Sequence, residues 1–112
     1  MSHLNVNLIK CLSDNYSYII FNPKSKKAII IDPAEADPLA DAITKLNLNL
    51  EYILITHHHH DHVGGNIELK KKFNCKIVGF ADDSNRIPGI DIMIKDREIF
   101  NFENEEIQLN FS

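Results

Sequence analysis

The sequence predicts an α/β fold, layered in the α+β manner, with helices packed against a sheet. Three observations support this prediction. Short apolar runs typical of strands recur along the chain, helical patterns lie between them, and the composition is that of a globular protein, with 44% hydrophobic and 25% charged residues. The length of 112 residues allows one domain, residues 1–112.

Three strands are predicted in the first part of the chain. The first shows alternation of apolar and polar residues, with apolar side chains at Leu4, Val6 and Leu8. Residues 16–21 follow a polar turn and form the second strand. Residues 28–31 are wholly apolar, which is typical of a strand that is covered on both faces.

A helix is predicted to begin at Asp37 and Pro38. Asp can accept hydrogen bonds from the free backbone N–H groups at a helix start, and Pro fits the first helical position without losing a needed donor. One apolar face then follows at helical spacing, formed by Leu39, Ala42, Ile43 and Leu46. We therefore expect a helix that lies on a sheet.

The second part of the chain also alternates strands with a helix. The expected elements are a strand at 52–55, a helical stretch opened by Gly64 and Gly65 that ends near Phe73, a strand at 76–80, an irregular loop at 81–91, and strands at 92–94, 99–102 and 107–111. The strand at 52–55, the histidine-rich segment that follows it and the next helix are expected to form one unit.

Charge and hydropathy argue against two classes of partner. The net charge is -4, and the only basic cluster, Lys70 to Lys72, is too short to follow a nucleic-acid backbone. No stretch approaches the roughly 20 apolar residues that span a bilayer, and residues 1–10 lack the layout of a signal peptide. We therefore expect a cytoplasmic protein with neither nucleic-acid nor membrane partners.

The two cysteines are interpreted as structural. Cys11 and Cys75 lack metal-ligand spacing, and two cysteines in a chain that is not secreted are more often small buried apolar residues than a disulfide.

The chemistry of the sequence is concentrated in residues 56–62, Thr-His-His-His-His-Asp-His. Five imidazoles and one carboxylate directly follow a predicted buried strand, which fixes the backbone on one side. Alternate residues such as His57 and His59 can then point the same way and bind one ion, while Asp61 and His62 serve a second. His58 and His60 are expected to face away from the metals.

Imidazole and carboxylate ligands suit zinc, iron and manganese, so the residue types predict metal without fixing the element. Two such ions lower the pKa of a water molecule and polarise the carbonyl that it attacks, which makes hydrolysis the natural chemistry. An expression tag and a surface loop with adventitious metal binding are alternative interpretations. The strand before the cluster and Gly64 and Gly65 after it favour a true metal site.

Asp32 is a further candidate, at the end of the predicted strand 28–31. Its carboxylate could cap the approach to the next helix. It could instead lie near the ligand segment and orient a ligating histidine without touching the metal.

The segment His57-x-His59-x-Asp61-His62 resembles the metal motif of the metallo-β-lactamase superfamily, and residues 56–66, THHHHDHVGGN, resemble the version found in glyoxalase II, the hydroxyacylglutathione hydrolases. Residues 13–18, 32–36 and 86–91 resemble the same family, in the same order and at similar spacing. The resemblance covers essentially the whole chain.

The resemblance implies the amino-terminal half of an αββα sandwich, with His57 and His59 on a first zinc ion and Asp61 and His62 on a second. It also implies an activity: hydrolysis of 2-hydroxyacyl-glutathione thioesters, such as S-D-lactoylglutathione, to D-lactate and glutathione in methylglyoxal detoxification. Iron or manganese can replace zinc in this family.

The sequence departs from the family at its end. The family's next histidine ligand, its bridging aspartate, its last histidine and its glutathione-binding helical region find no counterpart in residues 1–112. Four ligands are present where the family uses seven. We therefore expect a truncated domain that is inactive alone, because the thioester would not be held in line with a nucleophile.

Three interpretations remain open. The chain is a truncated or frame-disrupted glyoxalase II, half of a split enzyme completed by a second chain, or a non-enzymatic metal-binding or interaction module that self-associates. The half on its own would leave an apolar sheet face and an open edge in water, so it is expected to aggregate, to pair with something or to fold poorly.

Overall fold

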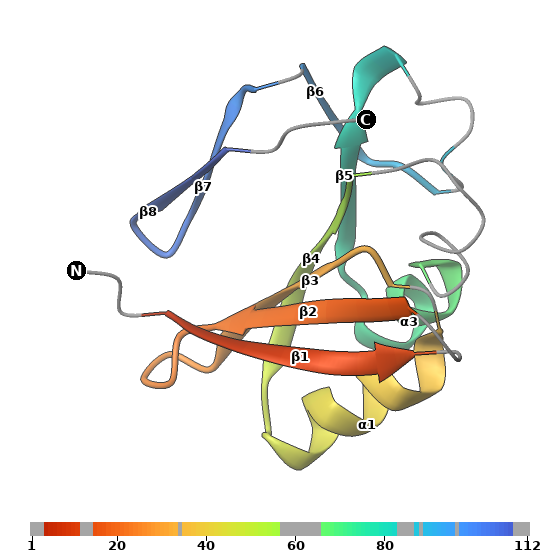
Figure 1. Ribbon diagram of the computed structural model, residues 1–112, viewed down its shortest axis with the longest axis vertical. Helices are drawn as coiled ribbons and strands as arrows, with labels where there is room; N and C mark the ends of the chain where they lie inside the picture. Colours follow the sequence, from red (N-terminus) through yellow and green to blue (C-terminus); the bar gives the residue numbers. More distant parts are fainter. Residues whose placement is uncertain are drawn as a thin grey trace.

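In the computed structural model, two helices pack on a mixed sheet that is partly covered by a hairpin (Figure 1). The structure describes residues 4–11, 15–33, 35–56, 66–82, 87, 89–95 and 97–108. Within them the elements are β1 (Asn5–Cys11), β2 (Asn15–Phe21), β3 (Lys27–Ile31), α1 (Ala36–Lys45), β4 (Asn49–Ile55), α3 (Asn66–Phe73), β5 (Lys76–Phe80), β6 (Ile92–Ile94), β7 (Ile99–Phe102) and β8 (Glu105–Gln108). The predicted α/β class is confirmed.

The main sheet brings the ends of its parallel strands to one edge. Its order is β1-β2-β3-β4-β5-β6; β1 pairs with β2 and β2 with β3 in antiparallel fashion, whereas β3, β4, β5 and β6 are mutually parallel. Ile31 at the end of β3 pairs with Leu54 of β4, and Ile55 pairs with Gly79 of β5. The residues that follow β3, β4 and β5 therefore leave the sheet together, which is where α/β proteins place their sites.

Helix α1 begins earlier than the sequence predicts. It starts at Ala36, and the preceding Glu35 makes no side-chain capping bond, so the prediction that Asp37 caps the helix is wrong. Pro38 is tolerated inside the first turn because the first N–H groups of a helix have no intrahelical acceptor. Asp37 contributes instead as a negative charge in the first turn, near the positive end of the helix dipole.

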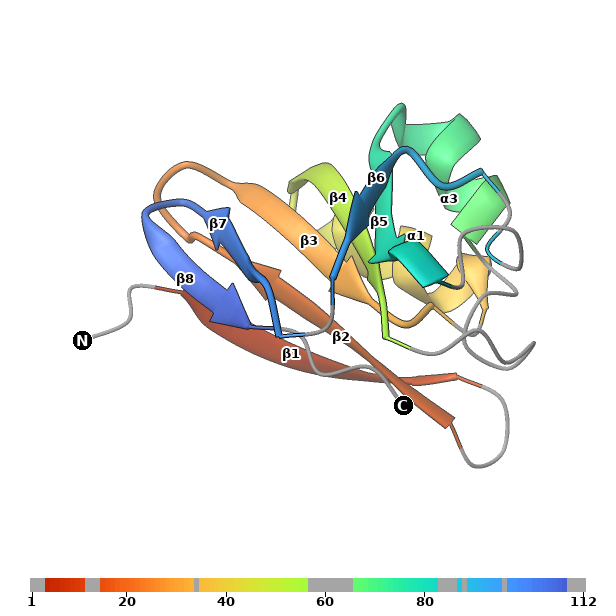
Figure 2. The same cartoon turned by 90° about the horizontal axis from the view of Figure 1, so that it is seen from above.

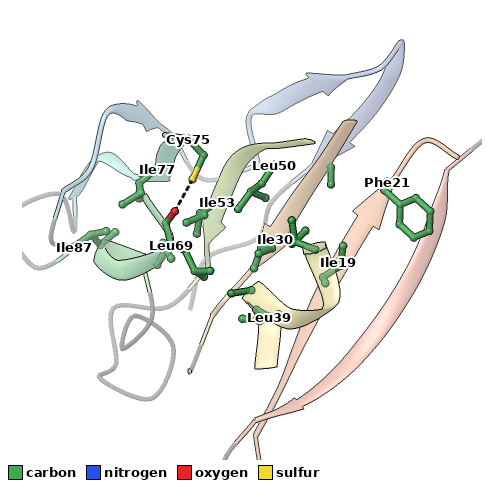
Figure 3. Packing of buried hydrophobic residues seen from close by; sticks show 14 residues of the cluster. Ile19, Phe21, Ile30, Leu39, Leu50, Ile53, Leu69, Cys75, Ile77 and Ile87 are labelled. Carbon is green, nitrogen blue, oxygen red and sulfur yellow. Dashed lines mark hydrogen bonds between the residues drawn. The ribbon is translucent and has the colours of Figure 1, made fainter. Parts of the chain in front are cut away.

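Both helices pack on one face of the sheet. Alternate strand residues point to this face, so that Ile30 and Ile53 meet the helices while their neighbours Ile29 and Leu54 point the other way. Figure 3 shows the resulting core, in which Leu39 of α1 and Leu69 of α3 meet side chains of the strands: Ile19, Ile30, Ile53 and Ile77. Ile43 of α1 is buried in the same cluster.

The opposite face is covered in part by the β7–β8 hairpin (Figure 2). Phe102 is buried against Ile29, Leu54 and Val78, and the ring of Phe100 meets that of Tyr52 edge to face at 5.1 Å. Over β1 and β2 the same face is open, because Val6 is 60% exposed and Tyr18 is 44% exposed.

The hairpin turn is tied to the turn between β2 and β3. Glu103 Oε1 accepts hydrogen bonds from Asn22 Nδ2 at 3.3 Å and from the Ser25 hydroxyl. The strand predicted at 107–111 begins earlier, since β8 spans Glu105–Gln108, and its predicted end falls in residues 109–112, outside the described residues. The strand predicted at 52–55 is longer than expected, since β4 starts at Asn49.

The irregular connection between β5 and β6 is held by an ion pair. Lys70 on α3 contacts the carboxylate of Asp91 at 2.8 Å, and Asp91 Oδ2 also accepts from the backbone N–H of Ile77 at 2.9 Å. The hydrogen bond from Lys70 is the main reason that the pKa of Asp91 lies below its ordinary value of 3.8.

The stability of the fold should therefore fall at acid pH in a way that depends on Asp91. Because the folded pKa is lowered, the stabilisation is fully present above pH 3.8 and is lost as the pH falls through the folded value. We expect Asp91→Asn to lower the free energy of unfolding by about 1 kcal/mol at neutral pH, since both side chains are partly exposed. Urea denaturation of both proteins at several pH values measures this. A difference that persists unchanged at pH 2 would contradict it.

Candidate metal centre

The predicted metal ligands lie between two elements of known position. His57, His59, Asp61 and His62 fall in residues 57–65, outside the described residues. That segment joins Thr56, directly after β4, to Asn66, the first residue of α3. Thr56, the residue before this segment, therefore lies at the edge where the parallel strands end.

Asp32 holds the residue that precedes the ligand segment. Its side chain is directed at Thr56: Oδ1 accepts from the backbone N–H of Thr56 at 2.6 Å, and Oδ2 accepts from the hydroxyl of Thr56. Asp32 is only 8% exposed, and charge-assisted bonds of this kind are stronger than neutral ones. The carboxylate thus ties the end of β3 to the end of β4, one residue before His57.

The backbone of Asp32 is held equally firmly. Its N–H donates to the carbonyl of Leu54 at 2.9 Å, and its carbonyl accepts from the hydroxyl of buried Ser17 at 2.7 Å. Asp32 has a φ of +51°, a left-handed conformation that costs about 1 kcal/mol or more for a residue with a side chain. These contacts from β2 and β4 stabilise that conformation.

The other side of the segment begins with a second buried polar side chain. Asn66 is 1% exposed, and its Oδ1 accepts from the backbone N–H of Ile67 at 3.0 Å. This hydrogen bond engages one of the N–H groups that lack intrahelical partners at the start of α3. Sequence reasoning did not single out Asn66 or Ser17. An Asn directly before an apolar helical run is a helix-start signal that could have indicated Asn66.

Cys75 is a structural residue, as predicted. It is 4% exposed, its Sγ lies 3.8 Å from the carbonyl oxygen of Leu69, and burial raises the pKa of its thiol to about 11. The thiol is therefore protonated at neutral pH and is not poised as a metal ligand. The side chain of Cys11 lies outside the part of the chain that the structure describes.

In residues 4–56 and 66–108, apart from the gaps given above, no three His, Cys, Asp or Glu side chains gather as metal ligands do. In the same residues no helix is long and apolar enough to cross a membrane.

Comparison with known proteins decides the family. A family model described as the metallo-beta-lactamase superfamily matches residues 12–99. The chain belongs to this superfamily. Structural comparison agrees on the fold: the BLEG-1 B3 metallo-beta-lactamase superposes with a TM-score of 0.79 at 19% identity, over 93% of this chain and 59% of that one. ETHE1 from Myxococcus xanthus gives 0.71 at 19% identity, over 87% and 43%.

Two similar sequences narrow the resemblance within the superfamily. The hydroxyacylglutathione hydrolase of Pelagibacter ubique is 44% identical over 106 residues, which are 95% of this chain and 44% of that protein. The hydroxyacylglutathione hydrolase of Methylococcus capsulatus is 46% identical over 97 residues, 87% of this chain and 38% of that protein. The predicted similarity to glyoxalase II is confirmed, and this chain spans less than half the length of these relatives.

Loss of the Asp32 carboxylate should weaken metal binding. Asp32→Asn keeps the size of the side chain but removes the charge that holds Thr56, and we expect zinc affinity to fall by about 10- to 100-fold. Competition with a chromophoric chelator measures the affinity. Asp41→Asn, an exposed aspartate on α1, is the matched control. Equal zinc affinity in wild type and Asp32→Asn would refute the role of Asp32.

Proposed function

We propose that this chain carries the amino-terminal half of the metal centre of a glutathione thioester hydrolase. The substrate class is 2-hydroxyacyl-glutathione, with S-D-lactoylglutathione as the representative that yields D-lactate and glutathione. The observation that carries the proposal is the similarity to hydroxyacylglutathione hydrolases over 95% of the chain. The Asp32–Thr56 contact supports it, because it anchors the start of the segment that bears the predicted ligands.

The donor set fits a pair of borderline metal ions. His57 and His59 would hold the first, and Asp61 and His62 the second, with zinc as the proposed element and iron or manganese as alternatives. When bound, such a pair lowers the pKa of water and polarises the carbonyl under attack. The protein would contribute the positions of the ligands. β3 and β4 fix Thr56, and a strand-like continuation would turn His57 and His59 to the same side.

The chain is proposed to supply only part of the catalytic groups. It spans 44% of the Pelagibacter ubique hydrolase, and we propose that the equivalents of the rest of that protein provide the remaining ligands and the glutathione site. Two protein ligands per ion leave the thioester unpositioned, and positioning is a large share of catalysis. Residues 1–112 by themselves are therefore proposed to be inactive or nearly so, with methylglyoxal detoxification as the role of the completed enzyme.

A second candidate source of the remaining metal ligands and of the glutathione site is a separate, complementing chain. The observation that favours it is the open part of the sheet face over β1 and β2, where Val6 and Tyr18 are exposed beside the hairpin. Apolar surface of this kind is buried when a second layer packs on it. Self-association of the chain through this face, without catalysis, is the competing outcome, and a sizing experiment on the isolated chain separates the two.

Activity should require both halves and the predicted ligands. We expect purified residues 1–112 with zinc to hydrolyse S-D-lactoylglutathione near the buffer rate. Addition of the carboxy-terminal remainder of the Pelagibacter ubique hydrolase, which begins after the matched region, should raise the rate by about 100-fold or more. Absorbance of the thioester bond follows the reaction.

The histidine variants make this experiment specific. His59→Ala should abolish the restored activity, whereas His58→Ala, at a position expected to face away from the metals, should retain it. Strong hydrolysis by residues 1–112 alone would overturn the incomplete-centre part of the proposal. Zinc binding with no hydrolysis in the complemented mixture would overturn the thioester hydrolase itself.

A further inference from the structure

The predicted ligand segment has two ends, and different contacts fix each of them. Residues 57–65 connect Thr56 to Asn66. Asp32 holds the Thr56 end, as described above. The Asn66 end moves with α3, so the ligand geometry depends on whatever fixes that helix against the sheet.

Lys70 provides the polar part of that attachment. It lies one helical turn after Asn66 on α3. Its Nζ donates to the carbonyl oxygen of Gly89 at 2.8 Å and contacts both carboxylate oxygens of Asp91, Oδ1 at 2.9 Å and Oδ2 at 2.8 Å. Three acceptors on one ammonium group use its full donor capacity.

Asp91 connects Lys70 to the sheet. Its Oδ2 accepts from the N–H of Ile77 at 2.9 Å, and its own N–H donates to the carbonyl of Ile77 at 2.8 Å. Ile77 is a fully buried residue of β5, the strand that pairs with β4. Lys70 therefore connects α3 through Asp91 to the same sheet from which the ligand segment departs.

Close packing at Gly89 reinforces the contact. Gly89 has a φ of +75°, and a Cβ built there would lie 2.6 Å from Cδ1 of Ile67 and 3.3 Å from Cδ1 of Ile77. Gly89 thus lies against side chains of α3 and β5, where a larger residue would displace the tip of Ile67 and would be strained by the positive φ. Residues 86–91, which resemble the family but carry no predicted ligand, contain both Gly89 and Asp91.

We propose that Lys70 and Asp91 form a clamp that positions the metal-ligand segment by fixing α3. This inference rests on the metal centre proposed above. Metal sites require ligand distances within about 0.2 Å of their preferred values, and nine residues separate the two anchors. A small shift of α3 therefore disturbs the site long before it unfolds the protein. Lys70 and Asp91 are positioning residues, and neither is a proposed ligand.

Zinc affinity of the full chain tests the clamp. Lys70→Met and Asp91→Asn should each lower the affinity by about three- to tenfold, less than loss of a group that touches a ligand. The double variant should lose no more than the weaker-binding single variant, because both remove the same contact. Lys70→Arg, which keeps the charge, should recover most of the affinity. Lys71→Met is the control, an exposed lysine on the same helix.

Hydrogen exchange of the α3 amides, measured without metal, gives an independent readout. Lys70→Met should speed exchange in α3 but leave β3 and β4 unchanged. Faster exchange with unaltered zinc affinity would mean that the pair stabilises only the helix, and unaltered exchange would mean that it does not fix α3; either result overturns the clamp. A wild-type chain that binds no zinc would overturn the proposed metal centre itself, and the clamp with it.

Discussion

The contact between Asp32 and Thr56 is the constraint on which the candidate site depends. β3 and β4 are parallel, and parallel strands have no tight turn to align their ends. The Asp32 carboxylate performs that alignment by accepting from both the N–H and the hydroxyl of Thr56. Ser17 extends the contact to β2. Contacts among three neighbouring strands therefore fix the position of Thr56, from which the ligand segment starts.

Much of the fold follows from sequence pattern because its strands and helices are strongly apolar. The wholly apolar run in β3 correctly predicts a strand covered on both faces, since Ile29 meets the hairpin side and Ile30 meets α1. The start of α1 was misplaced because Asp and Pro are favoured throughout the first turn. The start of the last strand differs from the prediction, because the turn before β8 is confined to Glu103 and Asn104, both with positive φ, and the polar residues after them do not mark where the strand begins.

The candidate site, like the fold, can be predicted from the sequence only in part. Residue types and spacing predict the ligands, because metal chemistry limits which side chains can serve. The supporting residues are harder to predict, since their role arises from pairing between distant parts of the chain. Ser17 meets Asp32 across 15 positions, and Lys70 meets Asp91 across 21. Asp32 can be predicted as a candidate because it ends a buried strand. Its contact with Thr56 can be predicted only when the parallel register of β3 and β4 is known.

The two anchors of the ligand segment differ in strength for a physical reason. Asp32 is 8% exposed and accepts two hydrogen bonds from Thr56 at the end of a buried strand, so solvent screens its carboxylate only weakly. The Lys70 and Asp91 side chains are 33% and 31% exposed, and solvent screens their attraction. A screened contact of this kind contributes at most about 1 kcal/mol to folding. Under the proposed clamp this modest contact still bears on metal binding, because metal sites tolerate changes of only about 0.2 Å in their ligand distances.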